Sequence, residues 1–135
     1  MTDSTPGQAA RPLSPHVQVW RWHITMACSI LHRATGIALY VGALILAGWA
    51  MSLASGPQAY DAYKALLGSL LGKLVLFGLT VSIFYHLASG VRHLIWDTGH
   101  GFKPQFAEMM SAAAIAFGLV ASLAVWAIAG LMGAL

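Results

Sequence analysis

GIALYVGALILAGWAMSLA, residues 36–54, is a run of 19 residues without a charged side chain. About 20 helical residues are needed to cross the hydrocarbon core of a bilayer. Residues 66–90, LLGSLLGKLVLFGLTVSIFYHLASG, and residues 109–135, which carry no charge, are also long enough. Because lipid offers no partners to backbone N–H and C=O groups, such spans must be helical. The sequence predicts an all-α integral membrane protein with three transmembrane helices, at about 27–54, 66–96 and 107–134.

The composition of the whole chain agrees with a membrane protein. Of its 135 residues, 59% are hydrophobic and 8% are charged, whereas soluble domains carry about 25% charged residues. The net charge of +3 comes from scattered residues that form no basic stripe, which excludes a nucleic-acid partner. The one cysteine, Cys28, cannot form an intramolecular disulfide, and we expect it to be a small buried apolar residue.

The N-terminal residues differ from the rest in composition. Residues 1–15, MTDSTPGQAARPLSP, resemble neither a signal peptide with its apolar run nor an Arg-rich mitochondrial transit peptide. We expect residues 1–22 to form a tail and interfacial segment, and residues 23–135 the transmembrane domain. Five basic residues near the predicted inner helix ends, against two near the outer ends, favour a cytoplasmic N-terminus. The predicted location is a bacterial inner membrane in preference to a mitochondrial one.

The first polar cluster is SILHRATG, residues 29–36, at the predicted inner end of the first helix. Ionisable side chains within a span cost several kcal/mol, so they usually face a partner or a cavity and indicate function. Ser29 and Arg33 are four residues apart and share a helix face. His32 lies beside that face.

The second cluster is HLASGVRHLIWD, residues 86–97, at the inner end of the second helix. His86 and His93 are two turns apart on one side, with Gly90 between them, which puts His93 about 10 Å nearer the inner surface. A flat porphyrin would fit over the gap at Gly90, with its iron at His86 and its propionates among the boundary cations. Neutral imidazole is a common axial ligand of haem iron.

A structural interpretation of these side chains remains open at this point. A histidine such as His86 can simply hydrogen-bond a neighbouring helix, and His32, Arg33 and His93 lie at the boundary, where side chains snorkel towards water. Taking Arg33 and His93 as one level puts Tyr40 opposite His86. We therefore expect no second histidine of this chain at the depth of His86, so a haem with two histidine ligands would need a second polypeptide.

Three segments carry a resemblance to a known family: RPLSPH at 11–16, SILHRATG at 29–36 and HLASGVRHLIWDTGHG at 86–101. In this order and spacing they resemble the large membrane-anchor subunits of succinate dehydrogenase, the cytochrome b556 subunits of respiratory complex II. One departure is Ser89, where the family often has asparagine.

The resemblance implies a role for most of these side chains. His86 would supply one axial ligand to the iron of haem b, the other coming from the small anchor subunit. Ser29 and Arg33 would line the ubiquinone pocket, and His32, Arg33 and His93 would lie near the haem propionates. Asp97 matches the acidic residue that ends the second helix, and no role follows for it.

The resemblance also implies partners. The helical bundle would be completed by the small membrane-anchor subunit, next to an iron–sulfur subunit and a flavoprotein subunit. Succinate oxidation would belong to those subunits, because the chain has no GxGxxG dinucleotide loop. The chain would have no catalytic residue and no activity alone, and would anchor the complex, bind haem and help to reduce ubiquinone.

Two alternatives predict different behaviour. A haem-free structural anchor of a related fumarate reductase or succinate dehydrogenase would use its histidines only for hydrogen bonds. A small transporter subunit would use Lys73 and His86 to handle ions, but the sequence has neither an internal repeat nor a helix broken by proline. Replacing His86 separates the haem-binding subunit from the structural anchor, because only loss of a haem ligand would abolish a haem absorbance band.

Overall fold

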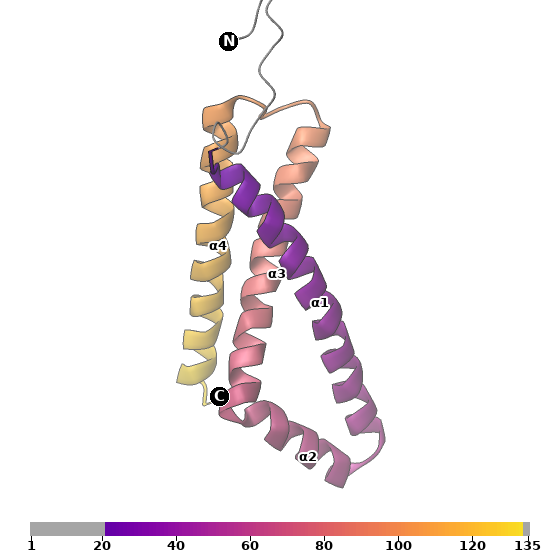
Figure 1. The fold of residues 1–135 in the computed structure, drawn as a ribbon. Coiled ribbons are helices and arrows are strands. Elements are labelled where there is room, and N and C mark those ends of the chain that lie inside the picture. The colour runs from indigo at the N-terminus through magenta and orange to yellow at the C-terminus, as the bar shows by residue number, and fades with distance from the viewer. Residues whose placement is uncertain (1–20, 134–135) are drawn as a thin grey trace, which may run out of the picture.

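The computed structural model describes residues 21–133, which fold into four helices joined by short turns. These are α1 (Ile24–Ala54), α2 (Pro57–Gly68), α3 (Leu70–Asp97) and α4 (Pro104–Leu131), as Figure 1 shows. Helices α1, α3 and α4 are long and apolar enough to cross a membrane. At 1.5 Å per residue, each is more than about 40 Å long, enough for the hydrocarbon core and headgroup layers. The predicted all-helical fold with three candidate spans is confirmed. Most of the expected N-terminal tail, residues 1–20, lies outside the described residues.

Helix α2 was not predicted, and it takes the first residues of the expected second span. The second long helix begins at Leu70 instead of Leu66. Ser69 stands between α2 and α3 with an extended backbone (ψ 161°), and its hydroxyl accepts a hydrogen bond from the Gly72 N–H at 3.1 Å. This is an N-cap, which satisfies one of the free N–H groups of the new helix. A Cβ at Gly72 would overlap the carbonyl oxygens at the end of α2, so glycine permits the tight turn.

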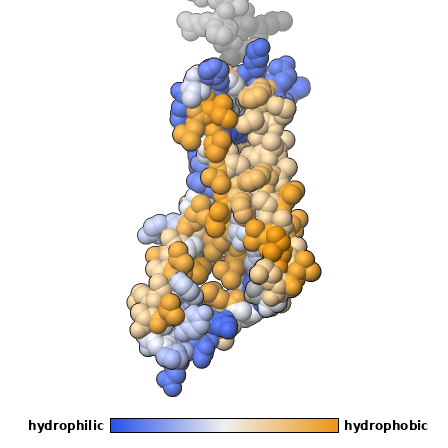
Figure 2. Space-filling view, turned by 180° about the vertical axis from the view of Figure 1, so that it is seen from behind, coloured by the Kyte–Doolittle hydropathy of each residue, from blue (hydrophilic) through white to orange (hydrophobic). Residues whose placement is uncertain are grey.

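Burial in this chain is inverted relative to a soluble protein. Large apolar side chains are exposed along all three long helices, and Figure 2 shows apolar residues over the middle of the molecule and hydrophilic ones at both ends. In lipid, apolar surface gives no drive for helix association, so small and polar residues form the contacts. The buried side chains other than glycine are Cys28, Ser52, Ser82, Tyr85, Ser89, Arg92, Ser111, Ala114 and Ser122.

Helices α3 and α4 lie side by side (Figure 1) because α4 presents a row of small residues to α3. The row consists of Ser111, Ala114, Gly118 and Ser122, spaced three or four residues apart and therefore on one face. A Cβ at Gly118 would lie 2.8 Å from the Cβ of Tyr85 and 3.1 Å from its Cα. The two helices thus approach each other closely at Gly118, where α4 has no side chain.

We expect Gly118→Ala to destabilise the α3–α4 pair by about 1–3 kcal/mol, because the added methyl group meets backbone and not a flexible side-chain end. Gly78→Ala is the matched control, since a Cβ there would meet nothing within 4 Å and alanine favours helix by about 1 kcal/mol. The measurement is the thermal unfolding midpoint of the purified assembly in detergent. Equal midpoints for the two variants would contradict the assigned contact.

Helix α1 crosses α3 and then diverges from it, with α2 lying across the open end (Figure 1). The crossing contacts involve glycines of α1: a Cβ at Gly36 would lie 3.3 Å from His86 Cε1, and one at Gly42 would lie 3.0 Å from Leu79. Farther along, the Tyr63 hydroxyl of α2 donates to the Ile45 carbonyl at 2.8 Å. The divergence leaves an apolar groove of about 630 Å³ between α1 and α3.

Candidate functional site

The SILHRATG segment places its polar side chains on two adjoining stripes of α1. Cys28, His32 and Thr35 recur at helical spacing and face the other helices: Cys28 is fully buried, and the other two are half-buried. Ser29 and Arg33 form the next stripe, as predicted, with Ser29 half-buried and Arg33 exposed. Neither Ser29 nor Arg33 makes a hydrogen bond or ion pair with another described residue. Their donors are therefore available to a ligand or to another subunit.

The structure brings together the three histidines of the two predicted clusters. The rings of His32 and His86 are stacked, with centroids 3.9 Å apart and planes at 13°. The ring of His93 meets His32 edge-on, with centroids 5.1 Å apart. The Nδ1 atom of His32 is buried and has no hydrogen-bond partner among the described residues. Helix α1 therefore adds an imidazole directly to the α3 pair.

This stacking corrects the predicted depths. The expectation that Tyr40 lies opposite His86, and that no second histidine reaches that depth, is wrong: His32 and Gly36 lie there instead. The count assumed parallel helix axes, whereas α1 crosses α3 obliquely (Figure 1). The lone pairs of ring nitrogens lie in the ring plane, so two stacked rings do not direct them at a common iron between the rings. In this arrangement His32 is a neighbour of His86 and not a second axial ligand.

His86 has the features that an axial haem ligand needs. It lies eleven residues before the end of α3, about 16 Å along the axis, and is therefore within the hydrocarbon region when α3 spans a bilayer. Its Nδ1 lies 3.1 Å from Thr35 Oγ1, and its Nε2 has no hydrogen-bond partner within residues 21–133. A Cβ at Gly90, one turn along α3, would meet nothing within 4 Å, so that side of the helix is open. These residues would suit a planar prosthetic group with its iron at Nε2.

A bare metal ion is a poorer fit to the same region. In the part of the chain that the structure describes, no group of three or more His, Cys, Asp or Glu side chains is placed to hold one. Haem iron needs only one or two protein ligands, because the porphyrin supplies the others. The donor set therefore suits haem.

Arg92 is a buried cation that the sequence analysis did not single out. It is 1% exposed and donates a hydrogen bond to Ser111 of α4, and its guanidinium lies 4.7 Å from the centre of the Trp96 ring. The signal was present in the sequence, because Ser82, Tyr85, Ser89 and Arg92 recur at helical spacing and form a polar stripe on α3. Buried within its own chain, Arg92 joins α3 to α4, and its Nε has no hydrogen-bond partner among the described residues.

The same buried layer ties α1 to the other two helices. The Tyr85 hydroxyl donates to the Cys28 carbonyl at 2.7 Å, and the Cys28 thiol lies 3.6 Å from the Ser111 carbonyl oxygen. The expected role of Cys28 as a small buried residue is confirmed. This layer holds α1 at the height where His32 meets His86.

Several other ionisable residues of the chain lie outside this cluster. His23 Nδ1 is 4.0 Å from Glu108 Oε1, His100 is bonded to Thr98 in an exposed turn, and Asp97 is exposed at the end of α3. Lys73 lines a hollow at the opposite end of the bundle, beside Lys64. His16 lies outside the described residues.

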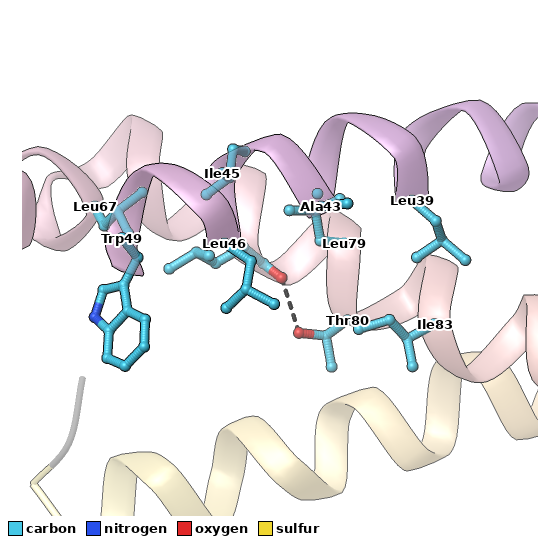
Figure 3. A pocket seen from close by; sticks show the side chains of 11 residues that line it. Leu39, Ala43, Ile45, Leu46, Trp49, Leu67, Leu79, Thr80 and Ile83 are labelled. Carbon is cyan, nitrogen blue, oxygen red and sulfur yellow. Dashed lines mark hydrogen bonds between the residues drawn. The ribbon is translucent and has the colours of Figure 1, made fainter. Parts of the chain in front are cut away.

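The apolar groove between α1 and α3, shown in Figure 3, offers no reactive group. Its lining is aliphatic and aromatic apart from Thr80. The Thr80 hydroxyl already donates to the Leu76 carbonyl at 2.8 Å and accepts from Trp126 Nε1 at 3.2 Å. The candidate site is therefore the histidine cluster and the adjoining Ser29–Arg33 stripe.

Comparison with known proteins shows the family of the chain. Residues 8–125 match the family described as succinate dehydrogenase/fumarate reductase transmembrane subunit. The succinate dehydrogenase cytochrome b556 subunit of Paracoccus denitrificans is 37% identical over 110 residues, covering 82% of this chain and 85% of that protein. The cytochrome b556 subunit of Rickettsia felis is 32% identical over 117 residues, covering 86% and 90%.

A mitochondrial relative matches over a shorter stretch. The human mitochondrial succinate dehydrogenase cytochrome b560 subunit is 42% identical over 98 residues, which cover 69% of this chain and 56% of the human protein. The bacterial relatives match along most of both chains, and their names agree with the resemblance expected from the three motifs. The chain belongs to the succinate dehydrogenase/fumarate reductase transmembrane subunit family, and its relatives over most of its length are cytochrome b556 subunits of succinate dehydrogenase.

Proposed function

We propose that this chain is the membrane-anchor and haem b subunit of a succinate:ubiquinone oxidoreductase, and that it helps to form the site where ubiquinone is reduced. The proposal rests on the surroundings of His86, an imidazole in the middle of a span. Its Nδ1 is hydrogen-bonded to Thr35, and its Nε2 has no hydrogen-bond partner among the described residues. The names of the relatives, cytochrome b subunits of succinate dehydrogenase, support the haem.

In this proposal, His86 Nε2 would bind the iron of haem b. Haem b, when bound, takes up and releases a single electron at its iron. The stacked pose of His32 favours a second axial ligand from the small anchor subunit. His93 is nearer the end of α3 than His86, and His32 stacks on the ring of His86. Both, together with Arg33, would hold the propionates.

Ser29 and Arg33 are the residues of this chain that would bind ubiquinone. Reduction of a quinone places negative charge on its carbonyl oxygens before protons arrive, and preorganised donors stabilise that charge. A hydroxyl and a guanidinium on one stripe, both without partners among the described residues, are such donors. Their place near the end of α1 brings the carbonyl oxygens within reach of the aqueous phase for protonation.

The exposed faces of the bundle support a larger assembly. Of the 31 residues of α1, Cys28 and Ser52 are the ones that this chain buries. The remaining surface would be covered by the small anchor subunit and by lipid, while the iron–sulfur and flavoprotein subunits dock at the end that carries Ser29 and Arg33. We place that end on the cytoplasmic side of a bacterial inner membrane, because more basic residues flank it.

Purification through this chain from its native membrane tests the proposal. We expect flavin, iron–sulfur and small-anchor subunits to copurify, and succinate to reduce a ubiquinone analogue at a rate that quinone-site inhibitors abolish. If the complex oxidises succinate with a soluble dye but does not reduce ubiquinone, the role of this chain is that of a structural anchor alone. A complex that works mainly as a fumarate reductase would redirect the assignment within the family.

A further inference from the structure

His86 is held by a short segment of α1, and this arrangement goes beyond the assignment of His86 as a ligand. Three residues within one and a half turns contact the His86 ring. His32 stacks on it, Thr35 forms a hydrogen bond with Nδ1, and Gly36 lies against Cε1. We propose that Thr35 is a positioning residue for the haem ligand, because its hydroxyl oxygen accepts the Nδ1 proton of His86 and so keeps Nε2 unprotonated towards the iron. The inference rests on the proposed function, in which His86 binds haem.

The proton of the Thr35 hydroxyl decides the direction of the bond. Oγ1 lies 2.8 Å from the Leu31 carbonyl oxygen and 3.0 Å from that of His32. A hydroxyl has one proton to donate and two lone pairs, so donation to these carbonyls leaves a lone pair for His86 Nδ1 at 3.1 Å. The Nδ1 atom must then carry the ring proton. In a neutral imidazole this leaves the Nε2 lone pair free to bind a metal.

The opposite tautomer is disfavoured by the same contacts. It would require the hydroxyl proton to turn away from both carbonyl oxygens and towards Nδ1. The ring proton would then sit on Nε2, which has no acceptor among residues 21–133. The opposite tautomer therefore keeps one hydrogen bond in place of two, and it leaves the Nε2 proton without an acceptor in the described part of the chain.

Gly36 and His32 restrict the orientation of the same ring. A Cβ at residue 36 would stand 3.3 Å from His86 Cε1, so glycine allows the ring to approach α1 closely enough for the Thr35 bond. The stacked ring of His32 covers one face of His86. His32, Thr35 and Gly36 therefore fix the orientation of the His86 ring, and His32 and Thr35 lie on a different stripe of α1 from Ser29 and Arg33.

Thr35→Val tests the inference in the whole complex, because valine keeps the branched shape and removes the acceptor. Loss of an outer partner of a metal-bound histidine weakens metal binding by about 10–100-fold. We expect at least about a tenfold loss of haem affinity, measured by transfer of haem to excess apomyoglobin. The haem midpoint potential should rise, because an imidazole without the Nδ1 bond is a weaker donor to ferric iron. Thr35→Ser should restore both values.

Thr80→Val is the matched control. Thr80 also donates to the carbonyl four residues back and also accepts from a ring N–H, that of Trp126, but it lies away from His86. Its replacement should leave haem affinity, potential and the electron paramagnetic resonance spectrum of the oxidised haem unchanged. If Thr35→Val does not assemble, Thr35→Ala removes the same acceptor without the added methyl group.

Each result decides between the inference and the proposed function. Wild-type potential and haem affinity in Thr35→Val, or equal shifts in Thr35→Val and Thr80→Val, would overturn the role of Thr35. Failure of Thr35→Ser to restore the values would do the same. If His86→Ala retains its haem, the proposed ligand is wrong, and the inference is lost together with it.

Discussion

Replacement of His86 by alanine is expected to abolish haem binding while the complex still assembles. The side chain is the mid-span imidazole with an unpartnered Nε2, and alanine offers no ligand in its place. Removing the ligand itself should weaken haem binding by more than the roughly 100-fold that loss of an outer partner can cause. The measurement is haem content per flavin in the purified complex, with the absorbance spectrum of the reduced form.

His100→Ala is the control for the His86 variant. This histidine is exposed, lies in the turn after α3 and is hydrogen-bonded to Thr98. Its replacement should leave the haem content at the wild-type level. Retention of a normal b-type spectrum in His86→Ala would assign the haem to other residues.

Replacement of Arg33 by glutamine has the second large expected effect. We predict a fall of about 100-fold in succinate-dependent ubiquinone reduction, the usual result of removing one donor to a developing oxyanion. Ser29→Ala should lower the same rate by up to about tenfold, because a neutral hydrogen bond contributes less. Succinate oxidation with a soluble dye should be unchanged in both variants, since it takes place in the other subunits.

Lys103→Gln is the matched control for charge at this end of the bundle. Lys103 is the exposed residue that precedes α4. Haem content must be measured in the same samples, because Arg33 is also placed near the propionates. A wild-type rate of ubiquinone reduction in Arg33→Gln would remove Arg33 from the quinone site.

The three spans and both polar clusters were predictable because each depends on local sequence. A charge-free run such as residues 36–54 admits one kind of structure in lipid. The spacing of Ser29 and Arg33 alone puts them on one stripe. The break at Ser69 was predictable in principle from its capping chemistry, but the apolar run on both sides concealed it.

The contacts between helices were not predictable in the same way. The stacking of His32 on His86 depends on the angle at which α1 crosses α3, and no residue count along parallel axes gives that angle. Ala112 and Ala116 are small residues of α4 like Ala114 and Gly118, yet both are exposed. Which small residues form the contact depends on how α4 is rotated, and the buried Ser111 and Tyr85 fix that rotation.

The role proposed for Thr35 shows why both levels are needed. Thr35 and Gly36 stand at the end of a polar segment, and the sequence alone suggests no role for either residue. Only the crossing of α1 over α3 brings the hydroxyl to the Nδ1 atom of His86 and the glycine to its Cε1. In the proposed function, this short segment thus serves two sites. Ser29 and Arg33 lie on one stripe, and the residues that orient His86 lie on the next.

The most direct test of the account is the difference spectrum, dithionite-reduced minus oxidised, of the wild-type complex purified through this chain. The account predicts a b-type band, with haem and flavin present in equal amounts. A complex that contains flavin and iron–sulfur subunits but has no haem band would contradict it, and the chain would then be an anchor without a cofactor.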